Sequence, residues 1–238
     1  MDEPVDDHPP AGETVAQKQH RLFGRGRDTG RIEYFTDAVI AIAMTLLVLD
    51  IKLPELGKHE TVFEALGRTW EQFFAYALSF VIIALNWVFH HRRFRAIVRY
   101  DSTLIWINLA FLLFIAVVPF PTSLLAEVGP TPEIITLYTG TLAIIGFLGG
   151  LCWWYAHRAD LLSTTIDREL YVYILGSNLI APVFFLLAIP LGFLLRAVRL
   201  DTGWALWFLL LNWAGGRIWA RWRGRREVRH DPDGELAG

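Results

Sequence analysis

The sequence has 238 residues, of which 54% are apolar, and its 22 basic and 24 acidic side chains give a formal net charge of −2. Soluble domains typically contain about 45–50% apolar residues, so the apolar content alone does not indicate the class of protein. The positions of the charged residues along the chain are more informative. Three stretches contain no Lys, Arg, Asp or Glu, namely residues 102–126, 134–156 and 171–195. Each is longer than the roughly 18 charge-free residues that indicate a membrane span. The sequence therefore predicts a polytopic all-α membrane protein and argues against a soluble domain.

The N-terminal segment 1–28 is predicted to be a disordered tail, because its first ten residues are acidic and rich in proline. It has neither the basic start nor the apolar core of a secretory signal peptide. The first membrane-spanning helix is therefore expected to direct insertion.

Six membrane-spanning helices follow in one domain, predicted over residues 29–222, with a C-terminal tail over residues 223–238. The predicted spans are residues 31–53, 70–91, 102–126, 133–157, 171–196 and 202–219. Pro119 and Pro121 should kink or end the third helix. Gly146, Gly149 and Gly150 should allow close helix contact in the fourth span.

Basic residues precede the first span and follow the second, fourth and sixth spans. The positive-inside rule therefore predicts a multi-pass protein of the cell membrane with both termini in the cytoplasm, which requires an even number of spans. The Arg cluster at residues 217–229 is interpreted as a topological anchor. Binding of anionic lipid or nucleic acid is the alternative, and no nucleic-acid partner is expected.

The first span differs from the others because its charge-free core covers only the twelve residues 38–49. At about 1.5 Å per residue this core is roughly 18 Å long, shorter than a hydrocarbon layer of about 30 Å. The helix must therefore include Asp37 near one end and Asp50 near the other. Charges at this depth usually face protein or water, so this helix is predicted to line a pore or a substrate path inside an assembly.

Arg31 and Asp37 lie six residues apart, too far for a direct pair on one helix face. Each needs a partner elsewhere, because a partly buried, unpaired charge is costly. Asn86 and His90, four residues apart near the end of the second span, are predicted to reach Asp37 or Arg31. The alternative interpretation makes Arg31 an interface anchor and Thr36 or Asp37 a helix N-cap.

The adjacent side chains of His90 and His91 point about 100° apart on a helix and make a poor metal pair. No metal or other cofactor is expected, and a structural hydrogen-bond network is the preferred interpretation. Proton sensing by a histidine is the alternative.

Several motifs occur in order along the first half of the chain. Residues 31–37 read RIEYFTD, the second span contains Asn86-Trp87 with His90 and His91, and residues 118–122 read VPFPT. These resemble the motifs of the transmembrane protein 175 family of potassium channels. The family opens its first helix with an Arg, three variable residues and Phe-Ser-Asp, so Arg31, Phe35 and Asp37 match, while Thr36 replaces the Ser and keeps its hydroxyl.

The resemblance implies a homotetramer in the lipid bilayer with the first helix lining a central pore that conducts potassium ions. It also implies that no TVGYG-type carbonyl filter is used, and the sequence contains no such motif. Ile42, Leu46 and Leu49 share one helix face and match the hydrophobic gate of the family, with Ile42 at the main constriction. Ordinary packing is the alternative explanation of this stripe.

Thr45 matches a hydroxyl position of the family that is implicated in selectivity. Alternatively, its hydroxyl bonds the backbone carbonyl of Ala41, as is common for Thr in membrane helices. Ala41 itself departs from members that carry a hydroxyl there, which argues against strong potassium selectivity.

A potassium-permeable cation channel is therefore the predicted function, and two other classes are weighed against it. A coupled transporter would use Asp37 and the histidines as ion sites, but the chain has no evident repeat and no Gly or Pro break in its first span. A membrane enzyme would act through Asp37 and His90, but no nucleophile-elbow or HExxH motif occurs.

Overall fold

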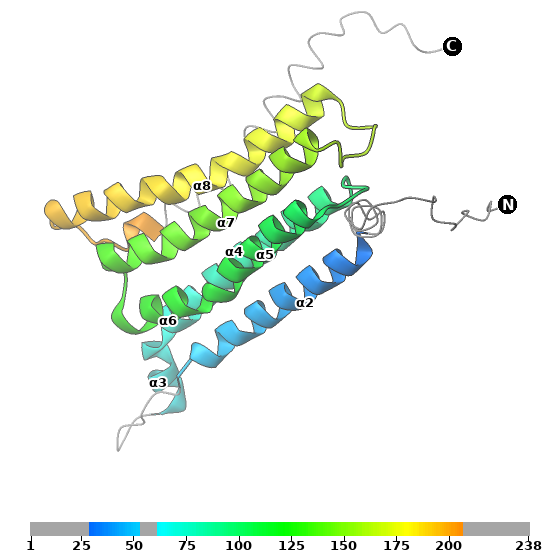
Figure 1. The fold of residues 1–238 in the computed structure, drawn as a ribbon. Helices are drawn as coiled ribbons and strands as arrows, with labels where there is room; N and C mark the ends of the chain where they lie inside the picture. Colours follow the sequence, from blue (N-terminus) through cyan, green and yellow to red (C-terminus); the bar gives the residue numbers. More distant parts are fainter. Residues whose placement is uncertain (1–28, 53–60, 207–238) are drawn as a thin grey trace, which may run out of the picture.

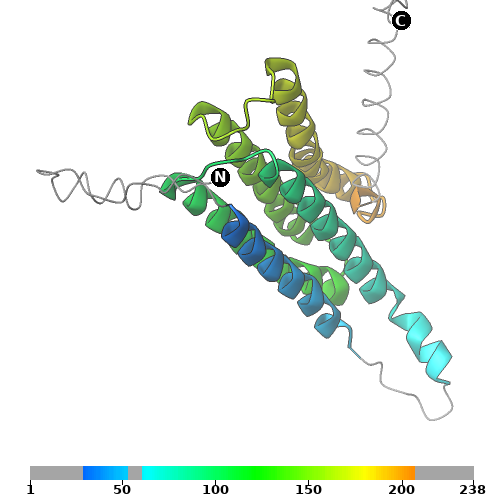
Figure 2. The ribbon, with the colours of Figure 1, turned by 90° about the vertical axis from the view of Figure 1, so that its right-hand side faces the viewer.

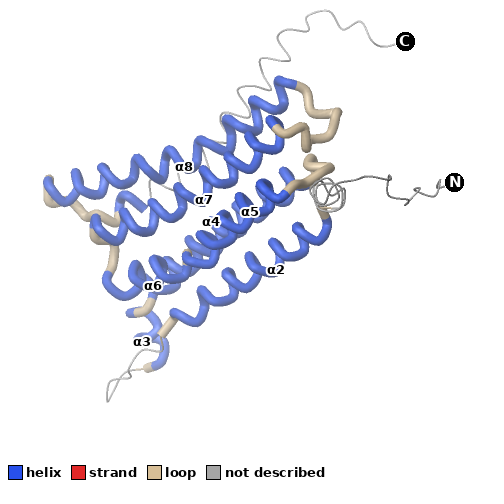
Figure 3. The backbone as a smooth tube through the Cα atoms, viewed as in Figure 1, coloured by secondary structure: helices blue, strands red, loops and turns tan. Residues whose placement is uncertain are grey.

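The computed structural model describes residues 29–52 and 61–206, and this part of the chain folds into helices joined by loops (Figures 1 and 3). The helices are α2 (Gly30–Leu46), the 3-10 helix η1 (Leu47–Asp50), α3 (Val62–Arg68), α4 (Trp70–Phe94), α5 (Ser102–Val117), α6 (Pro119–Val128), α7 (Pro132–Arg158) and α8 (Arg168–Ala197).

Five helical segments of the described part are long and apolar enough to cross a membrane. They are Gly30–Leu49, Trp70–Phe94, Ser102–Val128, Pro132–Arg158 and Arg168–Ala197. The first five predicted spans are therefore confirmed as helices. The sixth, predicted over residues 202–219, lies largely outside the described residues.

The third span is broken at Val118, where α5 ends and α6 begins with Pro119. A proline has no backbone N–H to continue the hydrogen-bond ladder, and its ring clashes with the preceding turn. The predicted break is confirmed. α6 starts with a proline in its first turn, a position that suits proline because the first N–H groups of a helix are unpaired anyway.

The connection between the first two spans contains a short helix, α3, that was not predicted from the sequence. Its start is a capping box, in which the Thr61 hydroxyl accepts from the Glu64 backbone N–H and the Glu64 carboxylate accepts from the Thr61 backbone N–H. These local bonds make the helix form despite its length of seven residues.

Helix α2 lies along one edge of the bundle and the pair α7 and α8 lies along the other, with α4 and α5 between them (Figures 1 and 2). Two glycines of α7 face α8 closely, because a Cβ at Gly146 would lie 2.9 Å from Pro182 and a Cβ at Gly150 would lie 3.3 Å from Leu179. Gly149 faces α4 instead, where a Cβ would lie 2.5 Å from the Arg93 guanidinium. The predicted role of these glycines in close helix contact is confirmed.

At the end of the bundle where α2 begins, the α4–α5 loop is joined to the α7–α8 loop. Ile97 and Leu162 form an isolated antiparallel bridge. The Tyr155 hydroxyl donates to the Asp101 carboxylate at 2.6 Å, and the same carboxylate caps the start of α5. These contacts tie the two halves of the bundle together.

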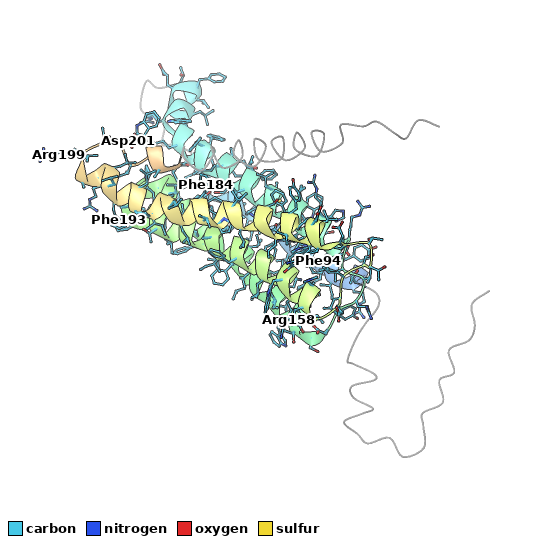
Figure 4. The ribbon with its side chains drawn as sticks, turned by 90° about the horizontal axis from the view of Figure 1, so that it is seen from above. Phe94, Arg158, Phe184, Phe193, Arg199 and Asp201 are labelled. Carbon is cyan, nitrogen blue, oxygen red and sulfur yellow. The ribbon has the colours of Figure 1, made fainter. Side chains whose placement is uncertain are left out.

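Phe94 and Arg158 lie at this same end of the bundle, whereas Phe193, Arg199 and Asp201 lie at the opposite end (Figure 4). Among the described residues, several of the basic side chains predicted to share one side of the membrane lie at the end where α2 begins. The exposed ones among them are Arg31, Arg92, Arg95, Arg158 and Arg168.

Candidate pore helix and its anchoring network

Helix α2 packs on α4 and α5 through one narrow stripe. Thr36, Ile40, Ala43 and Leu47 are almost completely buried and recur every three or four residues. This spacing puts them on one helix face. The stripe fixes the rotation of the helix about its own axis.

The opposite face of α2 is exposed in the single chain. Ile42, Leu46 and η1 residue Leu49 are 58%, 44% and 74% exposed. The structure therefore brings these three predicted gate residues together on one side of the helix. Such an apolar face is suited to hydrocarbon or to another protein surface.

Thr45 lies on the same exposed face. Its hydroxyl donates to the backbone carbonyl of Ile42 at 2.8 Å. The alternative of a bond to the Ala41 carbonyl is therefore wrong, although the hydroxyl does bond within its own helix. Donation within the helix orients the hydroxyl hydrogen inward and leaves oxygen lone pairs for another partner.

Asp37 is paired with Trp87 of α4, whose indole N–H donates to the carboxylate at 2.8 Å. The prediction that Asn86 or His90 would reach Asp37 or Arg31 is wrong. Asn86 donates to the Ile82 carbonyl of its own helix. Arg31 is exposed and makes no hydrogen bond or ion pair within the part of the chain that the structure describes.

The remaining members of the RIEYFTD motif are divided between surface and core. Phe35 is 53% exposed, whereas Thr36 is fully buried. The helix begins earlier, at Gly30, with Thr29 as its N-cap. The alternative in which Thr36 or Asp37 caps the helix is therefore wrong.

A buried hydrogen-bond network joins three helices behind α2. The amide nitrogen of Asn108 on α5 donates to the Thr36 hydroxyl at 2.9 Å, and its amide oxygen lies 2.8 Å from Nε2 of His90 on α4. With the amide in this orientation, His90 must carry its hydrogen on Nε2. The His90 ring also stacks on Phe94 and Phe111, with centroid distances of 4.2 and 5.2 Å.

His91 does not join this network. Its ring stacks on Trp87, with a centroid distance of 5.7 Å, on the side of α4 where Asp37 is bound. The two adjacent histidines thus point to different partners, and within the described residues no three His, Cys, Asp or Glu side chains cluster as metal ligands.

Sequence reasoning missed Asn108. A usable signal was present, because Asn108 is the one side-chain amide in the charge-free stretch 102–126. A polar side chain in such a stretch needs a buried partner or a functional role.

Comparison with known proteins shows which class of protein this chain resembles. A family model described as "Endosomal/lysosomal potassium channel TMEM175" matches residues 31–119. A potassium channel of Streptomyces collinus is 45% identical over 100 residues, which cover 42% of this chain and 48% of the relative, so the match spans about half of that protein.

A second relative, a potassium channel of Chamaesiphon minutus, is 38% identical over 182 residues, which cover 74% of this chain and 89% of the relative. The crystal structure of a lysosomal potassium-selective channel TMEM175 homolog from Chamaesiphon minutus superposes with a TM-score of 0.62 at 32% identity, covering 77% of this chain and 97% of that one. The chain is therefore a polytopic membrane protein of the ion-channel class. It belongs to the TMEM175 family.

Proposed function

We propose that this chain is a potassium-permeable cation channel in which α2 lines the central pore of a homotetramer. The observation that carries the proposal is the division of α2 into two faces. One face is held in the bundle by buried contacts and the Thr36–Asn108–His90 network, and the other presents Ile42, Leu46 and Leu49 to whatever lies outside the chain.

The composition of the exposed face favours a protein-lined path over lipid. On α8, several large apolar side chains are exposed, among them Leu187 at 50% and Leu194 at 58%. The exposed face of α2 adds the small or hydroxyl-bearing residues Ala38, Ala41 and Thr45 to its large apolar side chains. Small and hydroxyl-bearing residues are enriched where membrane helices meet other helices, so this face suits the centre of an assembly.

Fourfold rings of Ile42, Leu46 and Leu49 would form a narrow, apolar constriction that excludes water when closed. A cation without its hydration shell does not cross such a ring. Slight tilting or rotation of α2 widens the ring and admits water. The Thr45 oxygen, one turn from Ile42 and with its hydrogen directed to the helix backbone, supplies lone pairs to a passing cation.

The rest of the proposal concerns the whole chain. We place a sixth span over residues 202–219 within one channel domain of residues 29–222, preceded by the tail 1–28 and followed by the tail 223–238. Both termini are cytoplasmic, and the channel lies in the cell membrane. The collection of basic residues at the end where α2 begins supports this orientation.

The direct test is a measurement of reversal potentials for the purified protein in planar bilayers under gradients of potassium, sodium and pH. A channel gives passive currents whose reversal potential follows the potassium gradient. Saturable uptake that requires a proton gradient would replace the channel proposal by the coupled transporter. A reversal potential that follows only the pH gradient would assign proton conduction instead.

A substitution tests the gate. Ile42→Asn places a polar amide in the constriction, so water enters more readily and the resting potassium flux into liposomes rises. Ile42→Leu keeps an apolar ring of similar volume and should leave the flux low. Equal flux in both variants removes Ile42 from the gate.

A further inference from the structure

Three buried hydroxyl groups of three different helices meet in the bundle. Ser79 of α4 lies 2.8 Å from the Thr122 hydroxyl of α6 and 2.9 Å from the Tyr138 hydroxyl of α7, measured between oxygens. The three residues are 0%, 2% and 0% exposed. We call them the hydroxyl chain.

The hydrogens of this chain have one consistent order. The Thr122 hydroxyl donates to the Val118 carbonyl at 2.8 Å, and a hydroxyl has one hydrogen. Thr122 can therefore only accept from Ser79, and Ser79, having given its hydrogen to Thr122, can only accept from Tyr138. The chain runs from Tyr138 through Ser79 and Thr122 to the backbone carbonyl of Val118. Bonds aligned in one direction strengthen one another.

The chain ends at the break of the third span. Val118 is the residue between α5 and α6, and Pro119 and Pro121 have removed two backbone donors there. With fewer backbone hydrogen bonds, the angle between α5 and α6 needs support from neighbouring helices. The hydroxyl chain supplies it by tying α6 to both α4 and α7.

Helix α6 in turn contacts the outer end of the pore helix. It packs on η1, and the Lys52 ammonium that follows η1 pairs with Glu127 of α6 at 2.5 Å. The Lys52 backbone N–H also donates to Gln72 of α4 at 3.0 Å. The position of α6 therefore sets the position of the segment that carries Leu49.

We propose that Ser79, Thr122 and Tyr138 are positioning residues that hold α6, and through it the outer end of α2, in the conformation with the closed apolar constriction. This role rests on the proposed channel function. Loss of the chain should free η1 and favour the open state of the gate.

The test compares two threonines that differ in one respect. Thr122 and Thr139 are both buried, and each donates to the carbonyl four residues earlier at 2.8 Å. Among the described residues, Thr122 alone of the two also accepts from a side chain of another helix. Thr122→Val should raise the resting potassium flux by at least about fivefold, the equilibrium equivalent of one lost hydrogen bond, since every chain of the assembly loses one. Thr139→Val should leave the flux unchanged. Equal flux in the two variants overturns the proposal.

The order of the hydrogens gives a second readout that does not depend on conduction. Ser79→Ala leaves the Tyr138 hydroxyl without an acceptor, so this variant should melt at a lower temperature than Tyr138→Phe, which leaves only an unfilled acceptor. Adding Tyr138→Phe to Ser79→Ala should restore part of the melting temperature. If the decreases in melting temperature of the two single variants add up in the double variant, the proposed hydroxyl chain is contradicted. A parent protein without any cation flux refutes the proposed function, and the melting temperatures still decide whether the chain exists.

Discussion

Asn108 shows how a single amide connects α2 to its neighbours. It donates to Thr36 on α2 and accepts from His90 on α4, and all three side chains are almost completely buried. In a membrane, buried polar groups find no water, so the loss of one partner leaves the others unsatisfied. The amide therefore contributes more than an amide bonded only within its own helix.

The difference between Asn108 and an amide bonded only within its own helix gives a prediction about stability. Asn108→Leu removes the partners of both Thr36 and His90 and should destabilise the fold by about 2 kcal/mol. Asn86→Leu removes only a bond to the Ile82 carbonyl of the same helix, and its cost should stay below about 1 kcal/mol. Thermal melting of the detergent-purified variants, followed by size-exclusion chromatography, measures the difference. Equal melting temperatures would contradict the role assigned to the network.

The network could be predicted from the sequence only in part. The spacing of Arg31 and Asp37 indicated that each needs a partner outside its own helix face, and Asp37 does find one on α4. The partner is Trp87 and not Asn86 or His90, because helix periodicity says which residues share a face but not how two helices are rotated against each other. That rotation is set by packing of Ile40, Ala43 and Leu47 against α4 and α5, which involves contacts distant in sequence.

At the scale of elements, the pair α7 and α8 depends on small residues where the helices approach. Gly146 faces Pro182, a rigid ring that cannot move aside as a flexible side chain does. Gly140 lies on the same helix, and a Cβ added there meets no atom within 4 Å. The two glycines thus provide a matched pair for measuring how much the close approach contributes.

Gly146→Ala should destabilise the bundle by roughly 1–3 kcal/mol through overpacking. Gly140→Ala should be neutral or stabilise by up to about 1 kcal/mol, because Ala has the higher helix propensity. Melting temperatures of both variants in the same detergent test this order. A greater loss for Gly140→Ala would mean that the approach of α8 at Pro182 is not the limiting contact.

The elements themselves were largely predictable, since charge-free stretches and prolines leave strong signals in a sequence. The five described spans and the break at Val118 follow from those signals. The helix α3 and the Ile97–Leu162 bridge do not, because they depend on local capping and on two loops that meet only in the folded bundle. The predicted spans also missed the ends of α4 and α8, each of which extends one or more residues further.

For the whole molecule, the proposed pore requires the exposed apolar face of α2 to lie against other copies of the chain. If four copies place this face around one axis, it is covered without burying a charge, and the lipid-facing surface consists of the large apolar side chains of helices such as α8. Native mass spectrometry in detergent should therefore give four copies of the chain. A monomer or a dimer as the largest stable species would contradict the fourfold pore.

The anchoring of α2 should also affect assembly. Asp37→Ala removes the acceptor of the Trp87 indole N–H and loosens the inner end of the helix. We expect a lower yield of tetramer, measured by the same spectra, with little change in ion preference among the tetramers that form. Normal tetramers with altered selectivity would place Asp37 in the conduction path instead.

The central claim is that the face of α2 with Ile42 and Leu46 borders an aqueous path. It is tested most directly by introducing Ile42→Cys or Leu46→Cys into a Cys152→Ala background and treating reconstituted channels with a charged thiol reagent that does not cross membranes. Leu187→Cys on α8, 50% exposed in the single chain, is the control. We predict that the reagent reduces potassium flux for the two α2 variants and not for the control. Unreactive thiols at both α2 positions, with flux unchanged, would contradict the account.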